Sequence, residues 1–164
     1  MDFSMFTGFE GRINRAKWWI GIIILAVVAV IISLILNAVL GTSTVDPTQP
    51  DWVTTMVRKI SIGQLITLAI VIYPGLALAI KRLNDRDRPQ WFAYVFYAPT
   101  VLTILAGLAG LTMTVNGGIP ANSTIGWILS ILSIVVGIWA LIELGILKGT
   151  EGPNQHGPDP LAGK

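Results

Sequence analysis

The sequence contains no cysteine and a single histidine. Without cysteine it has no disulfide framework, no thiolate metal site and no cysteine nucleophile. The lone histidine, His156, is a poor basis for a metal site, no hydroxyl group has an evident base to activate it, and no phosphate-binding glycine loop is present. We therefore expect no metal, no cofactor and no enzymatic activity.

Charge is also scarce. Charged residues make up 12% of the 164 residues, about half the fraction typical of a soluble domain, whereas hydrophobic residues make up 53%. The formal net charge of +2 is too small and too scattered to indicate nucleic-acid binding. This composition indicates an integral membrane protein.

Four apolar segments are long enough to span a bilayer, which takes about 20 residues. They are 18–40, 60–80, 91–115 and 125–147. Lipid offers no partner to an open strand edge, so each segment should be helical. The first follows a basic lead, but it is too long for a signal peptide and lacks a cleavage site, so it should be retained. We predict an all-α protein with a single four-helix domain over 1–164, ending in the tail 148–164.

Basic residues are distributed unequally among the connecting segments. The N-terminal segment, the central loop and the tail contain nine, and the other two loops contain Arg58 and Lys59. The nine are Arg12, Arg15, Lys17, Lys81, Arg82, Arg86, Arg88, Lys148 and Lys164. Cytoplasmic loops carry such an excess. We therefore predict a multi-pass topology with both termini and the central loop in the cytoplasm.

The N-terminal segment places apolar residues at helical spacing, namely Phe3, Phe6, Phe9 and Ile13. Two interpretations remain open. The segment lies in the membrane interface with its aromatic rings toward lipid, or these side chains pack on the protein.

Small residues recur at steps of three or four in the third and fourth apolar segments. They are Thr100, Thr103, Gly107, Gly110 and Thr114 in one, and Gly126, Ser130, Ser133, Gly137 and Ala140 in the other. Small faces let membrane helices approach closely. We expect the third and fourth helices to pack against each other through these two faces.

Three residues inside the apolar segments need an explanation. Pro74 and Pro99 both lie about 11 Å from the central loop by helical rise, and they form either static kinks or a hinge around an inner cavity. Glu143 is the only charged residue in the predicted spans, and a carboxylate there needs a partner. It either reaches Lys148 or an arginine at the interface, or it belongs to an ion path.

The central loop and the tail have clear turn chemistry. Asp87 is placed to cap the third helix, with Gln90 three residues later as in a capping box. The tail residues 148–160 are rich in glycine and proline, which excludes a helix and favours a fixed path.

Three motifs occur in order along the chain. They are Gly11-Arg12-Ile13-Asn14-Arg15 with Trp18-Trp19, Arg82-Leu83-Asn84-Asp85 with Trp91, and Gly149-Thr150-Glu151-Gly152-Pro153-Asn154 with Gly157-Pro158-Asp159-Pro160. The pattern resembles the bacterial family called domain of unknown function 805. The resemblance implies a small protein of the bacterial inner (plasma) membrane without an agreed activity. Asn84 stands where the family usually has histidine, which puts a proton-transfer role there in doubt.

The predicted topology brings all three motifs to one cytoplasmic surface, which we call the motif face. Its candidate residues are Arg12, Arg15, Arg82, Asp85, Trp91, Asn154 and Asp159. Their charges form either a structural ion-pair network or a site for lipid headgroups or another small anion. We expect Arg82 or Asp85 to pair with a charged residue outside their own loop.

The leading hypothesis is therefore a non-enzymatic inner-membrane protein whose motif face binds membrane lipids, a membrane-protein partner or a second copy of the chain. The alternative is a small transporter or channel component that uses Glu143 and the kinks at Pro74 and Pro99. A membrane enzyme is a third and weaker possibility.

Overall fold

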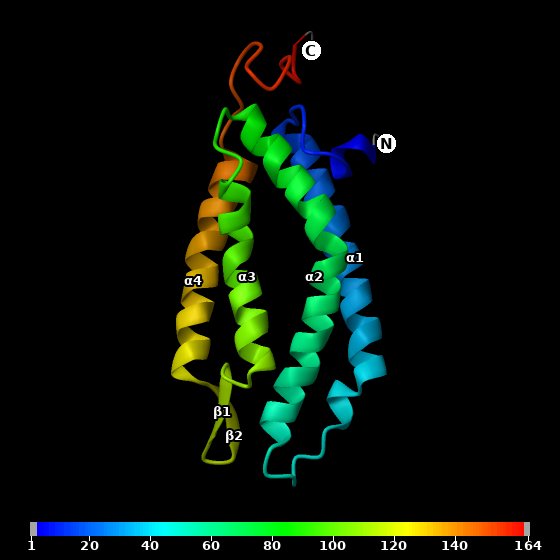
Figure 1. Cartoon of the computed structure of the whole chain (residues 1–164), viewed down its shortest axis with the longest axis vertical. Coiled ribbons are helices and arrows are strands. Elements are labelled where there is room, and N and C mark those ends of the chain that lie inside the picture. The colour runs from blue at the N-terminus through cyan, green and yellow to red at the C-terminus, as the bar shows by residue number, and fades with distance from the viewer. Residues whose placement is uncertain (1–2, 163–164) are drawn as a thin grey trace. The chain divides into compact units, whose positions relative to one another are not determined.

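The computed structural model describes residues 3–162, which are mostly helical (Figure 1). The helices are α1 (Arg15–Leu40), α2 (Trp52–Asp85), α3 (Phe92–Leu108) and α4 (Thr124–Ala140), with 3₁₀ turns η1 (Phe3–Phe6) and η2 (Thr42–Thr44). A π-helical segment, η3 (Leu141–Ile146), continues α4, and strands β1 (Met113–Asn116) and β2 (Ile119–Asn122) pair antiparallel. Lys164, one of the basic residues counted above, lies outside the described residues.

Within residues 3–162, three helical stretches are long and apolar enough to cross a membrane: Arg15–Thr44, Trp52–Asp85 and Thr124–Ile146. α3 has only 17 residues, which is at the lower end of the range that can span a bilayer. α2 begins at Trp52, earlier than predicted, because no glycine or proline interrupts residues 52–59. The prediction of long apolar helices is thus confirmed, but their bounds differ.

α3 ends at Leu108 because Gly110 adopts a left-handed conformation with φ 73°. The Leu111 N–H donates to the Ala106 carbonyl (2.8 Å), and the Gly110 N–H donates to the Gly107 carbonyl (2.9 Å). This is the Schellman pattern that terminates helices at a glycine. The sequence prediction that the third helix reaches residue 115 is therefore wrong.

The chain after α3 forms the hairpin β1–β2, which adds two short strands to the helical fold that the sequence predicts. Gly117 and Gly118 have φ 58° and 82°, as a two-residue hairpin turn of type I′ requires. Thr114, assigned above to a helical face, instead pairs with Ala121 across the hairpin.

The chain contains two compact units, each built from parts of all four helices. The first unit comprises 1–28, 70–97 and 136–164, and the second comprises 29–69 and 98–135. The first unit contains the three motifs and is therefore the one that matters for the site.

The first unit has a core of nine buried apolar residues. They are Met5, Ile13, Trp18, Leu78, Ala79, Ile80, Leu83, Ala93 and Leu144. Gly21 of α1 leaves no room for a side chain beside Leu78 of α2, and Gly145 of η3 lies against the rings of Trp18 and Trp19. These close approaches join α1, α2 and η3 within the unit.

The N-terminal segment is anchored to the protein. Lys81 Nζ donates to the carbonyls of Ser4 (2.5 Å) and Thr7 (2.6 Å). Phe6 packs against the core, whereas Phe3 is 68% exposed. Packing on the protein therefore holds for Phe6, whereas the orientation of Phe3 toward lipid stays a prediction.

In the second unit, glycines of the predicted small-residue face of α3 lie against α2. A side chain at Gly107 of α3 would collide with Ser61 of α2, and one at Gly110 would meet Thr54 of α2. At Gly137 of α4, which belongs to the first unit, no atom lies within 4 Å of the position a Cβ would occupy. The closest approach of these α3 glycines is thus to α2, because helical spacing defines a face but not its partner.

α2 and α3 continue through Pro74 and Pro99, respectively. Beside Pro74, a side chain at Gly75 would overlap the Tyr97 hydroxyl of α3. The two helices therefore make a close contact beside Pro74. The hinge stays a prediction.

The loop after α2 differs from the predicted capping box. Asp87 adopts a left-handed conformation with φ 53°, and its N–H and that of Arg88 donate to the carbonyls of Asn84 (3.2 Å) and Leu83 (2.9 Å). Asp87 therefore ends α2, at the position where glycine is usual. α3 begins later, at Phe92.

Candidate functional site

Arg82, in the last turn of α2, is completely buried. Its Nε donates to the Leu144 carbonyl (2.8 Å), a second nitrogen donates to the Leu147 carbonyl, and a third pairs with Asp85. The last carbonyls of a helix lack partners within it, and a guanidinium satisfies them and complements the negative end of the helix dipole. Arg82 thus joins the end of η3 to α2.

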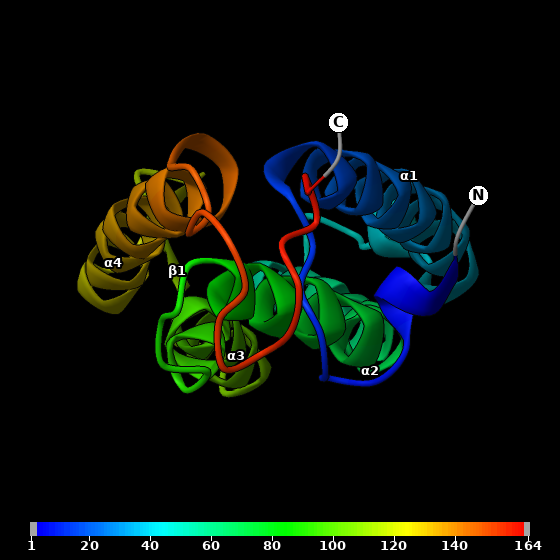
Figure 2. The ribbon, with the colours of Figure 1, turned by 90° about the horizontal axis from the view of Figure 1, so that it is seen from above.

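Arg12 connects the first motif to the other two. Its Nε lies 3.1 Å from Asp85 Oδ1. Its terminal nitrogens donate to the carbonyls of Thr150 (2.7 Å), Gly152 (2.8 Å) and Gly157 (3.3 Å). Figure 2 shows the tail passing over α2 beside the N-terminal segment. The Arg12 side chain is only 1% exposed, so it is a buried connector of the motif face.

Asp85 is shared by two guanidinium groups, because one oxygen pairs with Arg12 and the other with Arg82. Its backbone carbonyl accepts the Thr150 N–H (2.8 Å). A side chain at Gly149 would collide with the Asp85 carboxylate. The expected ion pair across motifs is therefore present, and the tail fits closely over it.

Asn84 is a fourth buried polar residue of this cluster, and it was not among the predicted site residues. Its Nδ2 donates to the carbonyls of Phe9 (3.1 Å) and Gly11 (3.0 Å), and its Oδ1 accepts from Gln90 (2.9 Å). Asn154 Nδ2 donates to the Asn84 carbonyl (2.9 Å). The central motif therefore binds the flanking motifs through Asn84 as well as through its charges.

Glu143 lies in η3 and is buried. Its carboxylate pairs with Arg86 (2.5 Å) and with Arg88 (3.0 Å). The expected arginine partner is thus present, but it comes from the central loop and not from Arg12, Arg15 or Arg82. Sequence reasoning missed these two partners, because several arginines lie within reach of one carboxylate.

Two predicted site residues lie outside the buried cluster. Arg15 is exposed at the start of α1 and donates to the Ile146 carbonyl (3.3 Å). Trp91 is 58% exposed and contacts Phe92 edge to face, with the two ring centroids 4.5 Å apart. They belong to the same unit, but they do not share the ion pairs of Arg12, Arg82 and Asp85.

Asp159 organises the end of the tail. Its carboxylate accepts the backbone N–H groups of Leu161 (2.8 Å) and Gly152 (3.0 Å). These two hydrogen bonds, with a smaller contribution from the charge of Arg12, lower the pKa of Asp159. Within residues 3–162 it forms no salt bridge, so backbone N–H groups are the main partners of its carboxylate.

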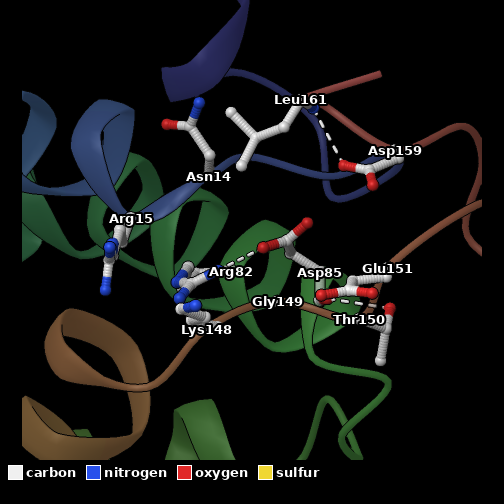
Figure 3. Close-up of a pocket in the computed structure, with 10 residues that line it drawn as sticks. All are labelled: Asn14, Arg15, Arg82, Asp85, Lys148, Gly149, Thr150, Glu151, Asp159 and Leu161. Carbon is white, nitrogen blue, oxygen red and sulfur yellow. Dashed lines mark hydrogen bonds and ion pairs between the residues drawn. The ribbon is translucent and has the colours of Figure 1, made fainter. Parts of the chain in front are cut away.

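A cavity of about 320 Å³ lies beside the cluster (Figure 3). Its lining residues are Asn14, Arg15, Arg82, Asp85, Lys148, Gly149, Thr150, Glu151, Asp159 and Leu161. In the part of the chain that the structure describes, no three metal-binding side chains are grouped to hold an ion. The arrangement is suited to binding a charged group through side chains of both signs.

Long apolar helices with a charged motif cluster define a helical integral membrane protein. The chain belongs to the family described as "Protein of unknown function (DUF805)", which matches residues 6–158. It is similar to inner membrane protein YhaI of Escherichia coli (strain K12), with 26% identity over 158 residues, covering 96% of this chain and 90% of the relative. It is also similar to inner membrane protein YhaH of that organism, with 25% identity over 157 residues, covering 94% and 88%. No solved structure matches.

Proposed function

We propose that this chain is a non-enzymatic protein of the bacterial inner membrane, with both termini in the cytoplasm, whose motif face binds a lipid headgroup. The observation that carries the proposal is the pair Arg15 and Lys148, which line the cavity and form no salt bridge within residues 3–162. Cationic pockets between helices on the cytoplasmic side bind lipid headgroups.

The topology follows from the basic residues and from four membrane crossings. α3 has a helical length of about 25 Å, so it crosses a hydrocarbon core of about 30 Å with slight thinning of the bilayer. Reporter fusions test this arrangement. A fusion after Lys164 should give a cytoplasmic signal and an insertion at Asn116 an external one, and the reverse pattern would overturn it.

The depth of the cavity suits a headgroup. Trp19 is close to Arg15 in sequence, is 40% exposed and donates from Nε1 to the Gly145 carbonyl (3.2 Å). Partly exposed tryptophans concentrate at the level of lipid headgroups. The cations beside Trp19 therefore lie where lipid phosphates are found.

The buried cluster supports the cavity as a fixed scaffold. Arg82 and Asp85 line the cavity and are also held by helix ends and by Arg12. Binding sites whose supporting side chains are already held lose less entropy when a ligand binds. The ion pairs of Glu143 give this carboxylate a structural role, which favours headgroup binding over an ion path.

Lipid retention tests the proposal. The protein is purified from native membranes in mild detergent, and bound lipids and partner proteins are identified by mass spectrometry. Each cation near a lipid surface contributes about 1 kcal/mol, so the double variant Arg15→Ala/Lys148→Ala should retain about 30-fold less lipid. The matched control, Arg58→Ala/Lys59→Ala, should retain lipid normally. Equal retention by both variants, or a stoichiometric protein partner in place of lipid, would contradict the proposal.

A further inference from the structure

We infer that the ligand of this cavity is zwitterionic, a phosphodiester joined to a primary ammonium group, as in phosphatidylethanolamine. This inference rests on the proposed function and specifies its ligand class. It follows from the arrangement of charges around the cavity.

The cavity separates its positive and negative charges. Figure 3 shows Arg15 and Lys148 on the same side as Arg82, whereas Glu151 and Asp159 lie on the opposite side, beyond Asp85. One end of the cavity therefore suits an anionic group, and the other suits a cationic group.

The charges at the two ends are available to a ligand. Arg82 and Asp85 already pair with each other. Arg15 makes one long bond to a backbone carbonyl (3.3 Å), and Lys148 and Glu151 are exposed and form no salt bridge within residues 3–162.

Asp159 completes the negative end. Its two carboxylate oxygens each accept one backbone N–H, and a carboxylate oxygen has capacity for a further donor. Two cations thus face two carboxylates, and their charges sum to zero.

A purely anionic headgroup would place uncompensated negative charge near Glu151 and Asp159. Repulsion between charges of the same sign weakens the binding of such a headgroup, and charged sites gain specificity in this way. A zwitterion instead satisfies both ends, with its phosphate near Arg15 and Lys148 and its ammonium near the carboxylates. Such a headgroup has no net charge, as is also true of the sum of the four side chains Arg15, Lys148, Glu151 and Asp159.

The form of the cation follows from the lining. A primary ammonium has three N–H donors for carboxylates, whereas a quaternary ammonium has none and is recognised by aromatic rings. None of the ten lining residues is aromatic. The cavity therefore favours ethanolamine over choline.

The surroundings of the cavity favour a lipid as the source of this headgroup. A cavity of about 320 Å³ is at the small end for ligand sites, which span about 300–1,000 Å³, so it takes a headgroup without its acyl chains. Exposed apolar side chains lie near the cavity along the chain, namely Ile20, Ile146, Leu147 and Leu161. They provide a hydrocarbon surface for the acyl chains.

The test uses the full chain in nanodiscs of mixed phosphatidylethanolamine, phosphatidylglycerol and phosphatidylcholine, with retained lipids counted by native mass spectrometry. Wild type should retain phosphatidylethanolamine at least about tenfold over the other two, a difference of about 1.4 kcal/mol. Glu151→Gln should reduce that preference at least threefold without changing the melting temperature, since Glu151 is exposed. Asp46→Asn, outside the cavity, is the matched control.

Each other outcome has a distinct meaning. Preference for phosphatidylglycerol would overturn the zwitterion assignment and leave the proposed function standing. No retained lipid of any class would overturn the proposed function itself. If soluble glycerophosphoethanolamine binds as tightly as the lipid, the ligand is a free solute and the lipid assignment fails. An unchanged preference in Glu151→Gln would also overturn the inference.

Discussion

Arg12 and Asp85, 73 residues apart in the sequence, form a buried ion pair in which Arg12 Nε lies 3.1 Å from Asp85 Oδ1. Asp85 pairs at the same time with Arg82, so two guanidinium groups share one carboxylate. The additional positive charge is balanced by carbonyl groups of the tail, to which Arg12 donates. This relationship makes the motif face a single electrostatic unit.

The first prediction concerns the loss of this pair. Arg12→Ala leaves buried carbonyls without donors and weakens compensation of Asp85, so the free energy of unfolding should fall by about 3–5 kcal/mol. Arg12→Lys should recover only part of this lost free energy of unfolding, because an ammonium lacks the planar fork that reaches several acceptors. Thermal unfolding in detergent measures both variants. The control Arg58→Ala, at an exposed arginine, should lose only about 0–1 kcal/mol, and an equal loss would contradict a buried role for Arg12.

The second prediction concerns Glu143. Glu143→Gln should destabilise the protein by several kcal/mol, because Arg86 is left partly buried without its carboxylate. Arg86 Nε is already buried without a hydrogen-bond partner within residues 3–162. Losing the Glu143 carboxylate would therefore leave a second part of the same guanidinium without a partner. Melting in detergent, compared with the exposed change Glu151→Gln, provides the measurement. Enhanced stability of Glu143→Gln would indicate that this network is not structural.

The third prediction distinguishes two glycines. Gly107→Leu should destabilise the fold by separating α3 from Ser61 of α2, with a cost of about 1–3 kcal/mol for overpacking. Gly137→Leu should have little effect, since its surroundings within 4 Å are empty. Melting temperatures of the two variants decide the matter. Equal destabilisation would instead support a seam between α3 and α4.

The fourth prediction concerns the tail. Gly149→Ala should displace the tail from α2, because the added methyl group collides with the Asp85 carboxylate. Trypsin should then cut after Lys148 at least about tenfold faster, which corresponds to a loss of about 1.4 kcal/mol in tail docking. The matched control Gly137→Ala adds the same group in open space and should leave the cleavage rate unchanged.

The fifth prediction concerns pH. The pKa of Asp159 is lowered by backbone hydrogen bonds, so the stability this carboxylate contributes to the tail is fully present above its unfolded pKa of about 3.9. That contribution is lost as the pH falls through the lower folded value. When the pH falls below the folded pKa of Asp159, hydrogen exchange of the Gly152 and Leu161 amides should therefore accelerate. The acceleration should exceed the change with pH in the intrinsic exchange rate of an unprotected amide. Asp159→Asn should remove this dependence, and its persistence would contradict the assignment.

The sequence predicted the long helices well, because the length and apolar character of a membrane helix depend on one contiguous run of residues. It missed the end of α3, since Met113 and Val115 are as apolar as a helix continuation and the left-handed Gly110 resembles any other small residue. The Asp87 assignment failed for a similar reason, because a residue that can cap one helix can also end the preceding one.

The sequence predicted most of the residues that form the buried cluster, but it predicted fewer of the ion pairs between them. The three motifs identified Arg12, Arg82 and Asp85, and their convergence was expected from the predicted topology. The partners of Glu143 depended on the path of the central loop, which the sequence does not specify. Asn84 belongs to the central motif but was not predicted as a site residue, because a neutral amide carries no charge to signal burial.

The bonds from Arg12 to the tail also constrain how the protein is made. Arg12 leaves the ribosome 138 residues before Thr150, its partner in the tail. Until the tail has been translated, Arg12 therefore lacks the carbonyls of Thr150, Gly152 and Gly157, although Asp85 is already present to pair with it. The motif face is therefore completed only after the tail has been translated. A chain that stalls before the tail would leave Arg12 without three of its acceptors.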